Sequence, residues 1–161
     1  MTRRISLSAF EARVLRFAPD LERAYVAGFR RAALRLERYA VEEIDSAEPH
    51  PAVDTRTLRG SVSTEFVSGG AIVSVDAPHA PMIEYGTRPF FPPAAPLVEW
   101  AKRKGFATTE EEAKGVAFAV AKAISQRGIE PRRFFSKAWE RMRRELPSDI
   151  VRELAKIRPA R

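Results

Sequence analysis

The sequence contains no cysteine and only two histidines among its 161 residues. The lack of cysteine excludes disulfides, thiolate catalysis, cysteine-type zinc sites and cysteine-ligated iron–sulfur clusters. Long apolar runs are also missing: the longest uncharged stretches, 66–75 and 89–98, have ten residues each, whereas a membrane-spanning helix needs about 20. The basic start Met1-Thr-Arg-Arg is not followed by an apolar segment, so we expect no signal peptide and a cytoplasmic site of synthesis.

Motifs of nucleotide and metal chemistry are missing too. There is no Gly-x-Gly-x-x-Gly, no phosphate-binding loop and no His-Glu-x-x-His. His50 lies between two prolines in an expected loop. His79 has two carboxylates nearby for a metal site, Asp76 and Glu84, and Ser74 as a candidate nucleophile. Because a histidine in a proline-rich turn is more often structural, we predict no enzymatic activity, no metal and no cofactor.

The residues that are present have the composition of a globular protein, with 45% hydrophobic and 30% charged side chains. The length suits one domain, since domains usually have about 100–200 residues, and we predict a single domain over 1–161. Residues 1–40 carry nine basic and four acidic side chains, 41–129 nine and twelve, and 130–161 ten and five. Basic ends can indicate an acidic partner such as nucleic acid, but alternating Arg and Glu are typical of solvated helix faces.

Apolar residues at steps of three and four predict one long helix from Asp20 to about Ala47, with Asp20 as its N-cap. The repeating positions are Leu21, Tyr25, Phe29, Ala32, Leu36, Tyr39, Ala40 and Ile44. Residues 8–17 are predicted to form a short separate helix or a partly ordered arm. Gly28 either weakens the long helix or marks a close contact.

The middle of the chain predicts a hairpin and then an extended segment. Alternating residues in 61–67 and 71–75, joined across Ser68-Gly69-Gly70, indicate two antiparallel strands. Prolines keep residues 87–93 extended, because they exclude both a helix and an inner strand. In such a segment neighbouring side chains point to opposite faces, so we expect one of Phe90 and Phe91 to point inward and the other outward.

Helices are predicted for the rest of the chain. Pro96 begins one that Gly105 ends, and Thr109 with Glu112 forms a capping box for a helix to Arg127. A further helix is expected over 131–145, and a short amphipathic one after Pro147 within the extension 146–161. We therefore predict an α+β fold with a long N-terminal helix, a small antiparallel sheet and C-terminal helices packed on it.

Three segments together resemble the tail-component family of tailed bacteriophages, also called tail completion, neck or head–tail joining proteins. They are VDTRTLRGSV (53–62), APHAPMIEYGTRPFFPPAAPLVEW (77–100) and GIEPRRFFSKA (128–138). Their order agrees with the family, and the central motif is Glu84-Tyr85-Gly86-Thr87. One departure is Arg56, where the family usually has glycine. Gly86 is expected to adopt a positive φ between a short helical or turn segment and the extended one.

The resemblance implies a structural virion protein of the neck or head-proximal tail end, assembled in the host cytoplasm and without a membrane partner. Its implied partners are further copies in a ring, most often of six, neighbouring connector, portal-side, tail-tube or tail-terminator proteins, and packaged DNA passing through the lumen. The predicted contacts are the hairpin tip, Ser68, Gly69 and Gly70, and an arm of Arg88, Pro89, Phe90, Phe91, Pro92 and Pro93. The terminal helices are predicted contacts as well. Ring subunits contact one another through two different patches.

Two alternatives stay open at this point. The first is a basic DNA-binding accessory protein. Its candidate side chains are Arg30, Arg31, Arg35 and Arg38 in the long helix, and Arg132, Arg133, Lys137, Arg141, Arg143 and Arg144 near the C-terminus. The second is a small metal-dependent hydrolase that uses Asp76, His79 and Glu84.

Overall fold

The structure is a computed structural model that describes residues 7–46 and 57–157. Its elements are α1 (Leu7–Asp45), α2 (Thr57–Gly60), β1 (Val62–Val67), β2 (Gly70–Val75), α3 (Ala80–Tyr85), α4 (Ala94–Arg103), α5 (Glu110–Arg127) and α6 (Phe134–Leu154). The antiparallel pair of strands among helices confirms the predicted α+β fold. His50 and residues 53–56 of the first family-like segment lie outside the described residues.

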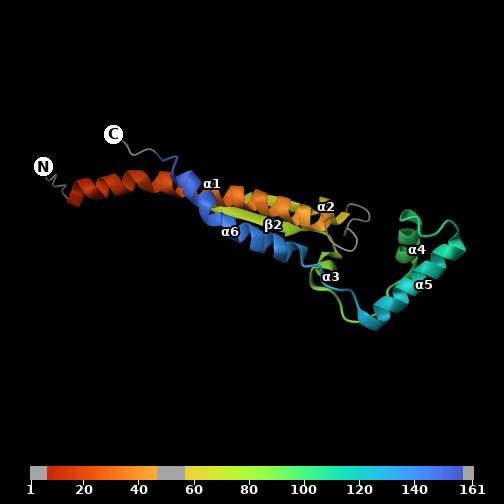
Figure 1. The fold of residues 1–161 in the computed structure, drawn as a ribbon. Coiled ribbons are helices and arrows are strands. Elements are labelled where there is room, and N and C mark those ends of the chain that lie inside the picture. The colour runs from red at the N-terminus through yellow and green to blue at the C-terminus, as the bar shows by residue number, and fades with distance from the viewer. Residues whose placement is uncertain (1–6, 47–56, 158–161) are drawn as a thin grey trace.

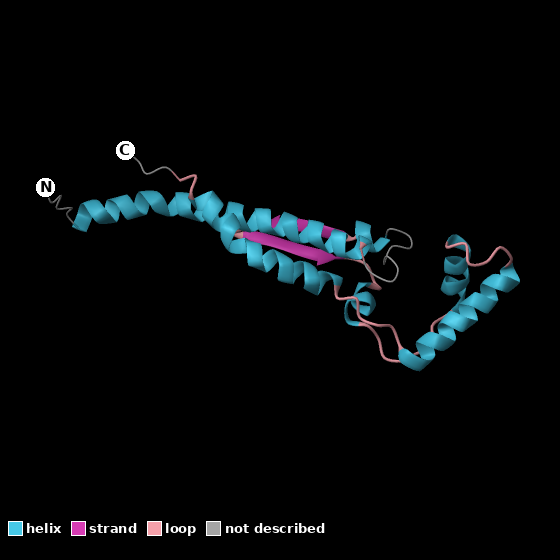
Figure 2. Cartoon of the chain, in the orientation of Figure 1, coloured by secondary structure: helices cyan, strands magenta, loops and turns pink. Residues whose placement is uncertain are grey.

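The chain is elongated and has two parts (Figure 1). Helices α1 and α6 and the hairpin lie side by side and form what we call the main body. Helices α4 and α5, here called the helical pair, stand apart at one end and pack against each other. Among the described residues, the connection between the two parts consists of loops and the short helix α3 (Figure 2).

Helix α1 confirms the predicted long helix but begins earlier, at Leu7, and runs through Pro19. The predicted start at Asp20, and with it the separate helix over 8–17, is wrong. A proline inside a helix leaves the carbonyl four residues earlier without its partner. That residue is Leu15, which is exposed, so water can satisfy the freed carbonyl and the helix continues.

Only the second half of α1 supplies the core of the main body. Its buried apolar residues are Ala32, Leu36, Tyr39, Ala40 and Ile44, which cluster with Leu58, Val62 and the α6 residues Phe134, Ala138 and Met142. Leu21, Tyr25 and Phe29 belong to the same sequence pattern but are exposed. The predicted apolar face is therefore only partly covered.

The hairpin has the predicted strands and turn. Val62 pairs with Val75, Thr64 with Val73 and Phe66 with Ala71. At the turn, Gly69 has a φ of 79°, which favours glycine. Residues two apart share a face of a strand, and Val62, Val73 and Val75 lie toward α1 and the core. The opposite face, with Ser63, Glu65, Ile72 and Ser74, is exposed.

Helix α6 is a single helix across Pro147, so the predicted break there is wrong. Charged side chains spaced by four on α6 meet matching ones on α1, which holds the helix in place beyond the proline. The contacts are Arg31 with Glu153, Arg35 with Asp149 (2.9 Å) and Glu145 (2.5 Å), and Tyr39 Oη donating to Glu145 Oε1 (2.9 Å). Asp149 and Arg35 in the middle of this ladder are largely buried, with side chains 1% and 17% exposed, whereas Glu145 and Arg31 remain partly exposed.

Gly28 lies where the two helices approach most closely. A Cβ at this position would lie 3.1 Å from the Cα of Ile150. The sequence left two roles open for this glycine, and the close contact is the observed one. A glycine here lets the two backbones approach near the end of the charged ladder.

We expect acid to weaken the α1–α6 contact. The pKa of the Glu145 carboxyl is held below its ordinary 4.5 mainly by the hydrogen bond from Tyr39, and that of Glu153 mainly by the bond from Lys156. A carboxyl whose pKa is lower in the folded state stabilises the fold above its unfolded value and loses that contribution as pH falls below it. The free energy of unfolding should therefore decrease as the pH drops below about 4.5.

Urea unfolding followed by circular dichroism at a series of pH values measures this effect. The double variant Glu145→Gln, Glu153→Gln is expected to lose part of the acid sensitivity, because it lacks both carboxyls. An identical pH profile for the variant and the parent would contradict the assignment to these two groups.

The helical pair has its own small core. Val98 and Ala101 of α4 pack on Ala113 and Ala117 of α5, with Trp100 at the edge. The predicted capping box starts α5: Glu112 N donates to Thr109 Oγ1 (3.2 Å), and the Glu112 carboxylate accepts from Thr109 N (3.2 Å). The alanines give α5 its close contact with α4, as their small size predicted.

Candidate interaction surfaces

The two parts of the molecule are joined by two chain segments, and these segments contain the family-like motifs. Residues 86–93 lead from α3 to α4, and 128–133 lead back from α5 to α6. The two motifs are far apart in sequence, yet their backbones are hydrogen bonded. Arg132 N donates to Ile83 O (2.8 Å) and Arg133 N donates to Glu84 O (3.1 Å). The sequence did not indicate that these motifs meet.

Glu84 is the centre of this junction. It is 5% exposed, and its carboxylate accepts from Phe135 N (2.8 Å), from Ser136 N (2.9 Å) and from the Ser136 hydroxyl. These two amides are in the first turn of α6, where backbone N–H groups lack helical partners. The carboxylate from α3 therefore caps α6, with a charge that suits the positive end of the helix dipole.

This capping role explains where α6 begins. The predicted start was Pro131, but the helix starts at Phe134. Residues 131–133 instead follow α3, and Arg133 adopts a left-handed conformation with a φ of 55° before the first turn. The capping carboxylate then lies against the amides of Phe135 and Ser136.

The candidate metal site loses one ligand to this arrangement. Both Glu84 oxygens already accept hydrogen bonds, and His79 is an exposed residue at the start of α3. Across residues 7–46 and 57–157, no group of three acidic or histidine side chains is placed to hold a metal ion.

The connecting segments 86–93 and 128–133 are held together at Gly86, Thr87 and Gly128. Thr87 N donates to Ile129 O (2.9 Å), and Ile129 N donates to Thr87 Oγ1 (3.0 Å). Gly86 has the expected positive φ, 71°, and a Cβ there would lie 2.5 Å from Ile129 O. A Cβ at Gly128, φ 74°, would lie 2.1 Å from Thr87 O. Both glycines are needed for conformation and for space.

The predicted arm, residues 88–93, spans the region between the two parts. Phe90 and Phe91 are both exposed, and Pro92 is the buried residue, so the expectation of one inward phenylalanine is wrong. Phe91, 59% exposed, reaches only Phe118 of α5, with ring centroids 6.4 Å apart. Phe118 is itself exposed.

The hairpin tip lies at the opposite end of the hairpin from α3 and the arm (Figure 1). It therefore does not form one surface with the arm. Near the tip, the Phe66 ring lies under the guanidinium of Arg30 on α1 (5.3 Å). Beyond it, Leu21, Tyr25 and Phe29 form an exposed row at every fourth position of α1, which we call the stripe.

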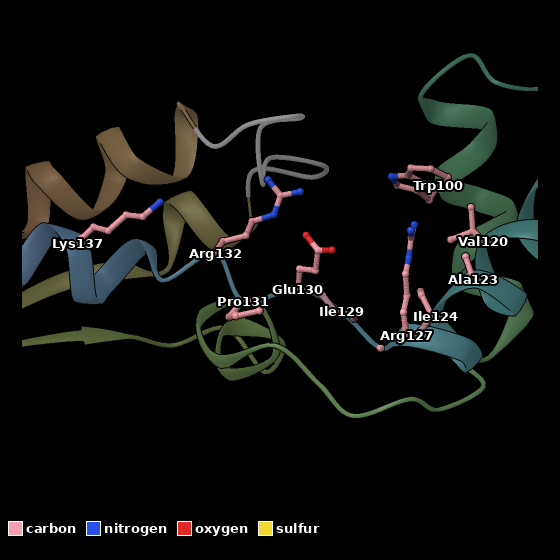
Figure 3. A pocket seen from close by; sticks show the side chains of 11 residues that line it. Trp100, Val120, Ala123, Ile124, Arg127, Ile129, Glu130, Pro131, Arg132 and Lys137 are labelled. Atoms are coloured by element: carbon pink, nitrogen blue, oxygen red, sulfur yellow. The ribbon is translucent and has the colours of Figure 1, made fainter.

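A cleft of about 770 Å³ separates the helical pair from the main body (Figure 3). Trp100, Val120, Ile124 and Arg127 line one side, Arg132 and Lys137 the other, and Ile129, Glu130 and Pro131 the floor. The helical pair contributes apolar side chains and Arg127, the opposite side contributes basic side chains, and Glu130 on the floor is acidic. The sequence did not predict this cleft, because it depends on how the two connecting segments pair.

Most of the arginines considered for DNA binding are already engaged within the chain. Arg31, Arg35, Arg38, Arg141 and Arg143 form ion pairs, and Arg30 lies over Phe66. Within the described part of the chain, Arg133, Lys137 and Arg144 of the same set have no ion pair. In their described residues, these helices therefore do not present a continuous face of unpaired basic side chains.

None of the helices in the described ranges is long and apolar enough to cross a membrane. Comparison with protein-family models, with curated proteins and with solved structures finds no match for the chain.

Proposed function

We propose that this protein is a structural subunit of a tailed-bacteriophage neck, a tail completion protein that assembles as a ring and helps to join the tail to the DNA-filled head. The observation that carries this proposal is the position of the exposed apolar side chains. Two groups of them lie at different places: the arm with Phe118 beside the helical pair, and the stripe on α1 beyond the hairpin tip. Others, such as Ile72, Trp139 and Val151, are exposed elsewhere. Two distinct patches on one subunit are what a ring requires.

The exposed surface area supports the same proposal. The chain exposes 11,677 Å², whereas a compact protein of 18.1 kDa exposes about 8,100 Å². The difference, about 3,600 Å², leaves room for two interfaces that each exceed the roughly 800 Å² per partner of a standard complex. An elongated subunit with a small second core gains stability when neighbours cover such surface.

The family-like residues contribute to this function indirectly. Glu84, Gly86 and Thr87 form hydrogen bonds or close contacts within the chain that hold the arm and the return segment in place. The arm then presents Phe90 and Phe91 at a fixed position, with prolines that lower the entropy lost on docking. The motif therefore supports the arm, and the arm makes the contact.

Deleting the gene from a phage or prophage that carries it tests the function. Electron microscopy of the lysate is expected to show filled heads and finished tails lying apart, and the purified protein should restore whole virions. Tails of abnormal length would instead indicate tail termination. Normal infectious virions would refute the proposal, and DNA binding by the remaining unpaired basic residues would then be the function to test.

The double variant Phe90→Ser, Phe91→Ser is expected to fold but to lose most of its ability to restore virions. Both side chains are exposed, so their loss barely changes the fold, while an interface loses two apolar anchors. Val151→Ser is the control, because Val151 is 62% exposed, close to the 59% of Phe91, but lies on α6 away from the arm. Full restoration by the double variant would show that the arm is not an essential contact.

A further inference from the structure

The stripe on α1 is an apolar face that the described residues of its own chain leave largely exposed. Along α1 the core face continues from Ile44 back to Ala32, where the hairpin and α6 cover it. The hairpin ends near Arg30, and Leu21, Tyr25 and Phe29 follow beyond it, with the rings of Tyr25 and Phe29 6.2 Å apart. The first part of α1 extends past the end of α6 (Figure 1).

The cleft has the complementary character. Its helical-pair side offers Trp100, Val120 and Ile124 to an apolar side chain, and the floor adds Ile129 and Pro131 beside the carboxylate of Glu130. At its rims, Arg127 and Lys137 have no ion pair among the described residues. Beside the stripe, Glu22 is exposed and likewise has no ion pair within the described ranges. The stripe thus combines apolar side chains with an unpaired carboxylate, and the cleft combines an apolar wall with unpaired basic side chains, so the two surfaces are complementary.

One chain cannot bring its own stripe to its own cleft. The stripe lies toward the free end of α1, and the cleft lies at the other end of the molecule beside the helical pair (Figure 1). The main body between them is held rigid by the α1–α6 charged ladder. Contact between the two surfaces therefore requires a second molecule.

We propose that the stripe of one copy docks in the cleft of the next copy. The contact is heterologous: each subunit gives its α1 to one neighbour and receives α1 from the other, so that a suitable rotation closes a ring. A helix with its side chains is about 10–12 Å wide, and only its apolar row enters the cleft. This inference rests on the proposed ring, and it names the surfaces that build it.

The absence of cysteine makes cross-linking a direct test. Single-cysteine variants Tyr25→Cys and Ala123→Cys place one thiol on the stripe and one in the cleft. When the two proteins are mixed and oxidised, we expect a disulfide-linked dimer that contains one of each, identified by mass spectrometry. Ser63→Cys mixed with Ala123→Cys is the control, since Ser63 lies on the exposed face of the hairpin. Mixed dimers no more abundant than in this control would overturn the proposal.

Association in solution gives a second measurement. Tyr25→Ser is expected to weaken self-association at least about thirtyfold, as loss of an aromatic anchor does in other interfaces. Leu34→Ser is the matched control: Leu34 is 52% exposed against 48% for Tyr25, and nine residues place it on the opposite side of α1. Analytical ultracentrifugation measures both. Equal association of the two variants, or a parent protein that stays monomeric, would contradict the docking.

The two proposals fail in different ways. Rings that form without the Tyr25–Ala123 cross-link would leave the neck function in place and remove this docking mode. A cross-linked ring from a gene whose deletion leaves virions normal would retain the docking mode and remove the neck function.

Discussion

Replacing the buried Gly128 with alanine is expected to lower the free energy of unfolding by roughly 3 kcal/mol or more. Two causes add. With φ at 74° and ψ at −159°, Gly128 occupies a backbone region that is essentially restricted to glycine. The added Cβ would also lie 2.1 Å from the carbonyl oxygen of Thr87, which is backbone and has no rotamer by which to move away. Urea unfolding of Gly128→Ala against the parent measures the change.

Gly105→Ala separates the two causes. Gly105 has nearly the same φ, 73°, but no atom lies within 4 Å of the added Cβ. Its replacement is expected to cost only the conformational part, roughly 1–2 kcal/mol. If both alanine variants lose the same stability, the connecting segments do not approach as closely as the structure has them. A larger loss for Gly128→Ala confirms the close pairing of Thr87 with the return segment.

Replacing Glu84 with glutamine is expected to cost roughly 2–3 kcal/mol of folding free energy, although the two side chains have nearly the same shape. The carboxylate faces only donors, the amides of Phe135 and Ser136 and the Ser136 hydroxyl. Glutamine keeps one acceptor oxygen and turns an NH₂ donor toward a donor, and it also removes the charge that suits the helix terminus. Thermal and urea unfolding measure the loss.

Glu84→Ala is expected to cost more than Glu84→Gln, because it leaves all the donors without an acceptor in a buried place. Glu65→Gln on the exposed face of the hairpin is the control and should change stability by less than about 0.5 kcal/mol. If Glu84→Gln matches this control, Glu84 does not cap α6. A stable Glu84→Gln variant that fails only in assembly would instead place the carboxylate in a contact between subunits.

Local signals in the sequence predicted most of the elements. Thr109 with Glu112 defined the start of α5, Gly128 its end, and Ser68-Gly69 the turn of the hairpin. The errors came from proline. Pro19 and Pro147 ended predicted helices, but both are exposed and the helices continue. Around Pro147 the side chains of Glu145 and Asp149 are held by α1, a contact 106 to 114 residues away in sequence that no local rule includes.

The candidate site was predicted in part. The sequence singled out the motif around Glu84 and the positive φ of Gly86, but it considered Glu84 only as a motif residue and a candidate metal ligand. Its partners, the amides of Phe135 and Ser136, are 51 and 52 residues further along the chain. The stripe was visible as part of an apolar repeat. Only the structure determines which part of that repeat stays uncovered, because that depends on where the hairpin ends.

The double connection between the main body and the helical pair has a mechanical consequence. A helical pair attached through one chain segment could rotate about that segment. Two segments that run side by side resist bending, because one is stretched while the other is compressed. The hydrogen bonds between Thr87 and Ile129 join the two segments. A load on them therefore passes to α3 through one segment and to the first turn of α6 through the other. In the proposed ring, force on the arm from a neighbouring subunit would thereby be delivered to the long helices, which distribute it along the subunit.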